Sequence, residues 1–462
     1  MKNKGSVTIF CCLMITAMVL LGLSALRAVS HHLAKAKGAV AVRSAMSGVN
    51  AGYNSYIFEN YHILLFDKYC GGRGEAYLEE QLIRDIQYNL GDGFQVCQVG
   101  VSDYELLLEN DCQAFKEQIK EYCGYALIES GANSILESTG GQDGTVSEYV
   151  YQDIEAAEEN EEIIPDIPGG DVEDPRDFTE NLTEDGILAI VAPEDLTISS
   201  EIVELYGVPS LENKKFKLLN YEIDNDFDDM DVLREDIGKY DSWKDSLISG
   251  GAGVAYASAV FNCATKQLQE DTVFNFELEY IICGMDSDKS NLKGTVNRII
   301  GIRLPVNYAY LVSDAAKMGE IAKLSVPLSM ATMVPEPILR YLIAGCWAYV
   351  EAIFDVRCLL EGQSMDFLKN STNWKTDLYD LESSVNLEGQ ESESGLCYKD
   401  YLLILLSMNM EDNYYRMLDV IELNTKKQYP NFDMNNASVG FSADVHISYD
   451  GKDYYYSKTV GY

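Results

Sequence analysis

Residues 4–28 read KGSVTIFCCLMITAMVLLGLSALRA, and this segment determines where the rest of the chain lies. The twenty residues from Val7 to Leu26 carry no charge. As a helix they would be about 30 Å long, which is the thickness of the hydrocarbon core of a bilayer. Ten of them are Leu, Ile, Val or Phe, and together these favour insertion by about 3 to 6 kcal/mol. The sequence therefore predicts a transmembrane helix, with the membrane-anchor residues Val7, Phe10, Leu13, Ile15, Val19, Leu20, Leu23 and Leu26.

A cleaved secretory signal is the main alternative for this segment. Such a signal has a shorter apolar run that is followed by a small-x-small cleavage site. Here the run is long, and Leu26 and Arg27 occupy the positions where small residues would be needed. A buried core helix is the third interpretation. We predict that the helix is retained as a permanent anchor and that the lipid bilayer is the first partner of the chain.

The charge of the chain changes sign after residue 58. Residues 1–58 contain six basic residues and no acidic residue, whereas the remaining residues carry a net charge of −45. Both flanks of the apolar run are basic, so the positive-inside rule alone does not set the orientation, but long domains are translocated largely regardless of their charge. We predict a single-pass protein of the cell membrane with a cytoplasmic N-terminus and an extracellular body.

Four regions follow from hydrophobic periodicity and composition. Residues 1–66 are predicted to form the transmembrane helix and an amphipathic stalk, because Leu33, Ala36 and Val40 continue a helical spacing. Residues 67–136 are predicted to be helical, with EAYLEEQLIRDIQYNL and DYELLLENDCQAFKEQIKEYCGYALIES as the two helices. Residues 137–186 are rich in Gly, Pro and acids, which is typical of a linker or long loop. Residues 187–462 are predicted to be a globular body of mixed secondary structure, so the fold class is α+β.

Several elements of the body can be predicted individually. GILAIVAP (186–193) and VFNFELEYIICG (273–284) are predicted strands, the first apolar throughout and the second alternating. GGAGVAYASAVFNCAT is predicted to be a helix of small residues on which other elements pack closely. Residues 319–362 are predicted to form a pair of helices that is interrupted at VPEP. The tail alternates around Asp450–Gly451, which predicts a C-terminal β-hairpin.

Composition excludes some classes of function. A net charge of −39 argues against binding of nucleic acid, because a phosphate backbone needs basic side chains opposite it. Nine cysteines outside the apolar run are scattered and form no C-x-x-C pair, so neither a zinc site nor a disulfide framework is indicated. Most of them are interpreted as small buried hydrophobic residues, and one or two disulfides stay open if the body is exported.

One acidic segment resembles a calcium-binding loop. In DNDFDDMDVLRE (224–235), Asp224, Asp226, Asp228 and Glu235 occupy the first, third, fifth and twelfth positions of such a loop. The sixth position, where glycine allows the sharp turn, holds Asp229 instead. A solvated acidic loop is therefore the preferred interpretation, with a bound calcium ion as the alternative, and no other cofactor is predicted.

The carboxylates Glu277 and Glu279 are the pair considered for catalysis. On the predicted strand both lie on one face, where a pair of carboxylates can perform acid–base chemistry. An exposed face is the preferred interpretation, with the pairing of one of them to Arg303 or Arg340 as an alternative. Because the sequence also lacks H-E-x-x-H, G-x-S-x-G and P-loop motifs, we predict that the protein is not an enzyme.

Several segments together resemble an uncharacterised family of membrane-anchored proteins of Gram-positive bacteria, domain of unknown function 5702. The segments are KGSVTIF at the start, AGYNSYIFENYHILLFD at 51–67, and residues 276–311, 346–362 and 401–424. The family is associated with Tad-type pilus or secretion genes and is loosely similar to TadE/TadG-like minor pilins. The resemblance therefore implies other pilus or secretion proteins as partners. It assigns no catalytic residue.

The pilin-like side of this resemblance concerns the first ten residues. Prepilin peptidases cut after a glycine, and Gly5 followed by Ser6 is suitably placed. Filament subunits of this kind carry a glutamate five residues after the cut, where this chain has Phe10. These observations lead to the hypothesis of a surface-exposed, pilin-like accessory protein of a Tad-type system. The alternative is an exported acidic module that captures cations or a basic cell-wall partner.

Overall fold

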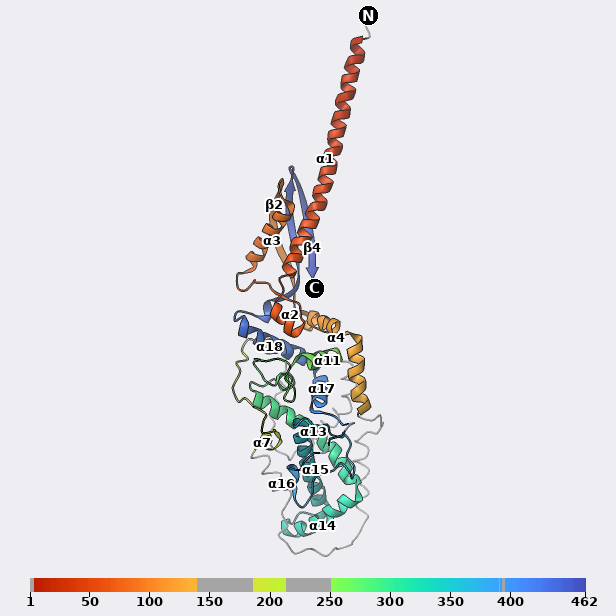
Figure 1. Cartoon of the computed structure of the whole chain (residues 1–462), viewed down its shortest axis with the longest axis vertical. Coiled ribbons are helices and arrows are strands. Elements are labelled where there is room, and N and C mark those ends of the chain that lie inside the picture. Colours follow the sequence, from red (N-terminus) through yellow and green to blue (C-terminus); the bar gives the residue numbers. More distant parts are fainter. Residues whose placement is uncertain (1–3, 139–185, 213–250, 390, 393–394) are drawn as a thin grey trace. The chain divides into compact units, whose positions relative to one another are not determined.

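The computed structural model describes residues 4–138, 186–212, 251–389, 391–392 and 395–462 (Figure 1). The chain divides into two compact units, which are described separately. Unit 1 comprises residues 1–118 and 425–462, and unit 2 comprises residues 119–424. The predicted acidic linker and the calcium-like loop lie outside the described residues, apart from the ends of the linker. Long helices together with a small antiparallel sheet confirm the α+β class.

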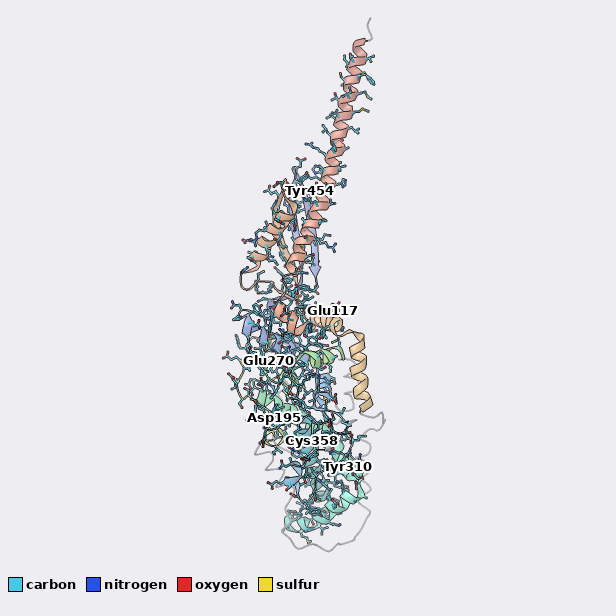
Figure 2. The ribbon with its side chains drawn as sticks, viewed as in Figure 1. Glu117, Asp195, Glu270, Tyr310, Cys358 and Tyr454 are labelled. Atoms are coloured by element: carbon cyan, nitrogen blue, oxygen red, sulfur yellow. The ribbon has the colours of Figure 1, made fainter. Side chains whose placement is uncertain are left out.

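Unit 1 begins with α1 (Lys4–Asn50), which covers the predicted apolar run and continues into the predicted stalk but ends before residue 66. Its apolar N-terminal half contacts no other element of unit 1, and its side chains project freely in Figure 2. The helix is long and apolar enough to cross a membrane. Further along, the buried face of α1 consists mostly of small residues, whereas Leu33 and Val40 of the predicted stripe are exposed. The residues of α1 in the core are Ala34, Ala41, Val42, Ala45, Met46 and Val49.

The sheet of unit 1 joins the two ends of the chain. Its strands are β1 (Phe66–Asp67), β2 (Phe94–Leu106), β3 (Ala437–Tyr449) and β4 (Lys452–Gly461), all paired antiparallel. β3 is central: β2 pairs with one edge, and β4 and the short β1 share the other. The hairpin β3–β4 confirms the prediction, and positive φ values at Asp450 and Gly451 suit a tight hairpin turn.

One strand of this sheet was not predicted. Residues 67–136 were predicted to be helical, and α3 (Glu75–Leu90) and α4 (Glu109–Ser138) are helices, but β2 lies between them. The short helix α2 (Ser55–Tyr61) precedes β1. Apolar residues of α3 pack with α1 and the sheet into one core, and these are Leu78, Leu82, Ile86 and Leu90.

The described part of unit 2 is built from helices. The short ones are α7 (Leu188–Val191), α8 (Pro209–Glu212), α11 (Gly251–Val260), α12 (Glu277–Cys283) and α16 (Leu381–Val385). The others are the part of α4 after residue 118, α13 (Asp288–Ser313), α14 (Ala315–Thr332), α15 (Glu336–Leu360), α17 (Tyr398–Met408) and α18 (Met410–Gln428). The last four residues of α18 are counted with unit 1. The pair α14–α15 and the small-residue helix α11 confirm two predictions. A Cβ atom at Gly253 would lie 2.5 Å from the hydroxyl oxygen of Tyr414, so the close packing on α11 is real.

Two predicted strands are helical in the structure. Residues 186–193 contain α7, and residues 277–283 form α12. A short run of apolar residues does not distinguish a strand from a buried helix. In α12 all residues from Glu277 to Ile282 are buried, so there is no polar face to produce a helical period. The alternation of apolar and acidic residues from Phe276 to Tyr280 is therefore typical of a strand, although the residues from Glu277 onward form a buried helix.

Candidate functional site

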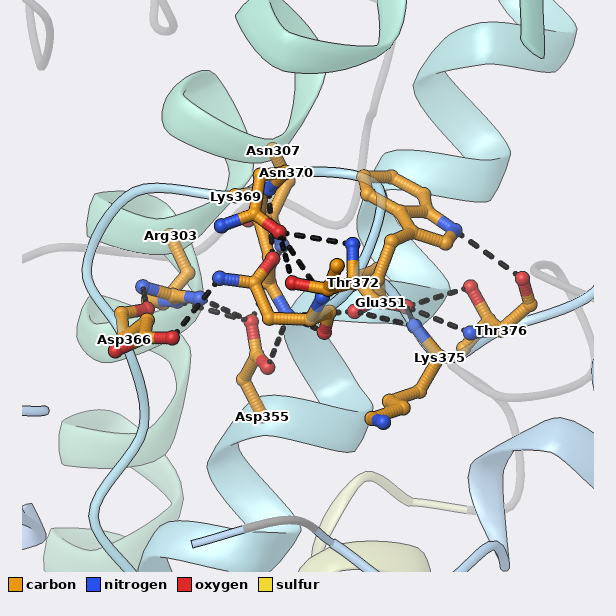
Figure 3. Close-up of polar contacts among 12 residues, drawn as sticks. Arg303, Asn307, Glu351, Asp355, Asp366, Lys369, Asn370, Thr372, Lys375 and Thr376 are labelled. Carbon is orange, nitrogen blue, oxygen red and sulfur yellow. Dashed lines mark hydrogen bonds and ion pairs between the residues drawn. The ribbon is translucent and has the colours of Figure 1, made fainter. Parts of the chain in front are cut away.

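Unit 2 contains a buried ion-pair cluster (Figure 3). We define it as Arg303, Glu351, Asp355 and Lys369. Arg303 lies on α13, Glu351 and Asp355 lie one turn apart on α15, and Lys369 belongs to the segment that follows α15. Arg303, Glu351 and Asp355 are fully buried and Lys369 is 8% exposed. The cluster has two positive and two negative charges, so its formal charge is zero.

Asp355 is the central acceptor of the cluster. Its Oδ2 atom accepts hydrogen bonds from Arg303 Nε at 3.0 Å and Arg303 Nη2 at 2.5 Å, and its Oδ1 atom accepts one from Lys369 Nζ at 2.7 Å. Burial on its own would raise the pKa of Asp355, but the charges of Arg303 and Lys369 outweigh it and hold the pKa below its ordinary value. Asp355 is therefore an ionised structural acceptor and not a proton donor.

Glu351 links the cluster to the segment after α15. Its Oε1 atom accepts a hydrogen bond from Lys369 Nζ at 2.5 Å, and its Oε2 atom accepts one from the hydroxyl of Thr376 at 2.7 Å and one from the Thr376 backbone N–H at 2.9 Å. Trp347 Nε1 donates to the same hydroxyl oxygen at 3.0 Å. The carboxylate thus holds the backbone near Thr376 against α15.

The two basic side chains have few hydrogens left for other acceptors. Lys369 Nζ contacts three acceptors, which are the two carboxylates and the carbonyl oxygen of Asn373 at 3.5 Å. An ammonium group has three N–H donors, and all three are engaged. Arg303 Nη1 donates to the carbonyl oxygens of Asp366 and Phe367, each at 2.8 Å. Arg303 and Lys369 therefore bind the protein's own chain, and neither is presented as a nucleophile or an anion receptor.

A small cavity of about 130 Å³ lies beside the cluster. It is lined in part by Asp366, Lys369, Asn373 and Ser392. The Asp366 carboxylate accepts hydrogen bonds from Asn373 Nδ2 at 3.0 Å and from Ser392 Oγ at 2.5 Å. Pockets for small molecules usually measure about 300 to 1,000 Å³. The cavity has room for a few water molecules, and the cluster is best understood as the support of the segment that follows α15.

Glu277 and Glu279, the predicted catalytic candidates, lie elsewhere in unit 2. Both are fully buried on α12, so the predicted exposed strand face is wrong. They point to different partners, because residues two apart on a helix do not share a face. The alternative, in which one of them pairs with Arg303 or Arg340, is also wrong. Arg303 pairs with Asp355, and Arg340 pairs with Glu336 on its own helix.

The partners of these two glutamates are mainly neutral donors. Glu277 accepts from the backbone N–H of Asn262 at 2.8 Å and from Asn424 Nδ2 at 2.7 Å. Glu279 Oε1 accepts from the backbone N–H of Ala264 and from the Tyr398 hydroxyl, each at 2.9 Å. Burial raises the pKa of Glu277 to about 8 and that of Glu279 to about 7, although these hydrogen bonds oppose the shift. The two carboxyl groups fix the segment before α12 to the neighbouring helices.

The remaining predicted site residues have the following places. Gly5 and Ser6 lie in the first turn of α1, and the eight anchor residues lie along it, each 54–67% exposed. All eleven cysteines are in the described part of the chain, where they are free thiols. Among described residues, no group of three or more His, Cys, Asp or Glu is arranged to hold a metal ion. Asp224, Asp226, Asp228 and Glu235 lie outside those residues.

The sequence did contain a signal for the ion-pair cluster that was not used. In CWAYVEAIFDVRCLLEG, Glu351 and Asp355 are four residues apart within an otherwise apolar part of a predicted helix. Two carboxylates on one apolar helical face require cations near them when the face is buried. Their partners could not be chosen from sequence, because Lys369 belongs to an irregular segment.

Comparison with known proteins gives a family without an assigned activity. No curated protein and no solved structure is significantly similar to the chain. The profile of the family of unknown function DUF5702 matches residues 168–449, which is more than half of the chain and includes the ion-pair cluster, Glu277 and Glu279. The chain is therefore a member of the DUF5702 family.

Proposed function

We propose that this chain is a single-pass membrane protein that serves a Tad-type pilus or secretion system as a pilin-like accessory protein without enzymatic activity. In this proposal α1 spans the cell membrane, the N-terminus is cytoplasmic and the body is extracellular. The membrane anchor in this proposal rests on α1. The association with a Tad-type system rests on the resemblance of the N-terminal segment and the stalk to that class of protein.

The observation that carries the proposal is the exposure of the apolar half of α1. The ten Leu, Ile, Val and Phe residues between Val7 and Leu26 are each at least 54% exposed. Burial of such a side chain is worth about 1.5 to 3 kcal/mol, so ten of them left in water would forgo roughly 15 kcal/mol or more. A bilayer removes this cost without any rearrangement of α1.

The arrangement of the charged groups supports a binding or scaffolding role. The carboxylates of the ion-pair cluster accept hydrogen bonds from buried protein donors, and the adjoining cavity is small. General acid–base catalysis needs a carboxyl group within hydrogen-bond reach of a substrate. Asp355 and Glu351 are instead enclosed by α13, α15 and the segment that follows α15.

Membrane fractionation of cells that produce the full chain tests the anchor. The double variant Leu13→Arg/Leu20→Arg places two charges in the apolar run, at about 2.5 to 3.5 kcal/mol each. This cost matches or exceeds the favourable insertion energy, so the variant should leave the membrane fraction. Val40→Arg is the matched control, since Val40 is 69% exposed beyond the run, and it should stay in the membrane.

Orientation and processing need two further measurements. Protease added to intact cells without their wall should degrade the body, and an undegraded body would refute the extracellular placement. N-terminal sequencing of the membrane form separates the remaining alternatives. A start at Met1 means a retained and unprocessed anchor, a start at Ser6 means prepilin-type processing, and a start after the apolar run would identify a cleaved signal.

A further inference from the structure

The hairpin β3–β4 runs alongside α1, and its contacts fix where its tip lies along that helix. The Tyr454 hydroxyl oxygen is 2.8 Å from His31 Nδ1, and the Tyr456 hydroxyl donates to the carbonyl oxygen of Lys35 at 2.9 Å. The Tyr462 hydroxyl donates to the carbonyl oxygen of Asn50. The strand and the helix therefore run in the same direction, and the tip of the hairpin points toward the apolar half of α1, as Figures 1 and 2 show.

The spacing of these contacts shows that the strand is nearly parallel to the helix axis. From Tyr454 to Tyr462 an extended strand covers about 27 Å. From His31 to Asn50 the helix covers about 28 Å. Because the two lengths agree, positions on β4 can be projected onto α1. Lys452 precedes Tyr454 by two residues, which is about 7 Å along the strand toward the tip. This places Lys452 close to the level of Arg27, which directly follows the apolar run of α1.

This level corresponds to a particular layer of a bilayer. The hydrocarbon core is about 30 Å thick and the whole bilayer about 40 to 45 Å, so each headgroup layer is roughly 5 to 8 Å deep. His31 is five residues beyond Leu26, or about 7 Å along α1. When the apolar run fills the core, the segment from Arg27 to His31 lies in the headgroup layer, and the tip of the hairpin lies at the same depth.

Aromatic and charged residues gather at this end of unit 1. Phe94 stacks on Tyr449 with ring centroids 4.4 Å apart, and Tyr449 lies edge-on to His31 at 6.1 Å. Asp450, Gly451 and Lys452 at the tip are exposed, as is Asp92 in the turn before β2. Aromatic rings with a polar edge and long basic side chains are enriched at the interface between membrane and water.

We propose that the tip of the β3–β4 hairpin and the adjoining α3–β2 turn lie in the headgroup layer of the bilayer that α1 spans, and form a second contact of unit 1 with lipid. This inference rests on the proposed membrane anchor. The sheet packs on one face of α1, so the contact at the tip lies on one side of the helix. It limits the tilt of the helix toward the side of the hairpin, because that tilt would push the charged tip deeper into the bilayer.

The partner is the lipid interface and not a specific headgroup. The exposed charges at this end are mixed, with Arg27 and Lys452 beside Asp92, Asp450 and Asp453. A surface without a dominant positive charge gains little from anionic lipid. The contact should therefore form on zwitterionic phosphatidylcholine vesicles as well as on vesicles that contain phosphatidylglycerol.

Tryptophan fluorescence of the full chain in such vesicles tests the proposal. The native tryptophans lie outside unit 1, so single tryptophans introduced as Lys452→Trp and Asp92→Trp report on the tip after subtraction of the wild-type signal. Lipids brominated near the headgroup should quench both probes more than lipids brominated near the chain end. Tyr53→Trp, which is three residues beyond the end of α1, is the control and should not be quenched.

The possible outcomes separate this inference from the proposed function. Failure of the wild-type chain to float with the vesicles would refute the membrane anchor and the inference together. Flotation with Lys452→Trp and Asp92→Trp as unquenched as Tyr53→Trp would overturn the inference and leave the anchor intact. Quenching only in vesicles with phosphatidylglycerol would replace the interfacial contact by an electrostatic one, and would also overturn it. The two probes lie on separate turns, so local misfolding caused by one substitution would not affect the signal of the other.

Discussion

Substitution of Asp355 by asparagine should strongly destabilise unit 2. The change keeps the size of the side chain but removes the charge that faces Arg303 and Lys369. Lys369 retains Glu351 as a partner at 2.5 Å, whereas Arg303 loses its only described carboxylate partner. The variant therefore leaves a guanidinium group buried in the protein without a compensating charge.

The magnitude follows from the burial of the pair. Both side chains of the Arg303–Asp355 pair are fully inaccessible to solvent, and removal of one partner of such a pair costs about 3 to 5 kcal/mol. The whole stability of a domain is about 5 to 15 kcal/mol, so this loss is a large share of it. With a urea dependence of about 3 kcal/mol per molar for a domain of this size, the unfolding midpoint should fall by roughly 1 to 2 M.

Urea unfolding of the detergent-solubilised full chain measures this loss. Trp347 and Trp374 lie beside the cluster, with ring centroids 5.4 Å apart, and replacement of Trp243 by Phe in all variants isolates their fluorescence. Arg340→Gln is the control, because the pair Arg340–Glu336 is partly exposed and such pairs contribute about 0.5 kcal/mol. If Asp355→Asn costs no more than Arg340→Gln, the assigned role of the cluster is wrong.

A double variant distinguishes lost charge compensation from lost packing. Apolar replacement of both members of a buried pair is often neutral or stabilising. Arg303→Met/Asp355→Leu should therefore be more stable than Asp355→Asn, while Lys369 remains paired with Glu351. The recovery is partial, because the carbonyl oxygens of Asp366 and Phe367 lose the hydrogen bonds from Arg303. A double variant that is as unstable as the sum of its single variants would contradict the electrostatic explanation.

Two further predictions concern a close contact in unit 1 and a proton in unit 2. A Cβ atom at Gly38 would lie 2.7 Å from Cζ of Tyr456. Gly38→Ala should therefore destabilise the packing of β4 on α1 by about 1 to 3 kcal/mol, measured as the loss of protection of the β4 amides against hydrogen exchange. Gly48→Ala on the same helix meets no atom within 4 Å and should be neutral or slightly stabilising; equal effects would refute the argument. Glu279→Gln should weaken the fall of stability between pH 5 and 7 by up to about 1.4 kcal/mol per pH unit in urea titrations. If the dependence of stability on pH is unchanged in the variant, Glu279 is already ionised in the native protein and the argument is wrong.

Long, strongly patterned elements could be predicted from sequence. The uncharged run gave α1, the Asp450–Gly451 turn gave the hairpin, and the interruption at VPEP separated α14 from α15. In each case a local rule was sufficient, because the signal lies within the element itself. The pairing of β2 with β3 was out of reach for the opposite reason. These strands lie more than 300 residues apart in the chain, and neither sequence contains a signal that indicates which strand it pairs with.

The candidate sites were harder to predict, because a helix that is buried on all sides has no alternation of apolar and polar faces from which its secondary structure could be recognised. Glu277 and Glu279 alternated with Phe276, Leu278 and Tyr280, which predicted a strand with a polar face. In the structure the carboxyl groups are enclosed and bound by backbone N–H groups and neutral side chains. A backbone donor has no sequence signature. The hydrogen bonds that make these glutamates tolerable in the core are therefore invisible in the sequence.

Unit 2 buries carboxyl groups by two different means, and these have opposite dependences on pH. Asp355 is paired with cations and has a lowered pKa, so its contribution is present above the ordinary value of 3.8 and is lost as the pH falls below it. Glu279 lacks a cation and has its pKa raised to about 7 by burial, so the native state holds a proton that the unfolded chain releases above 4.5. Stability from this group is therefore lost as the pH rises from 4.5 to 7. Glu277, whose pKa burial raises to about 8, acts in the same direction over a wider range. These groups together place the maximum of stability in mildly acidic solution, and because Glu277 remains, Glu279→Gln should leave that maximum in place and make the fall of stability toward neutral pH less steep.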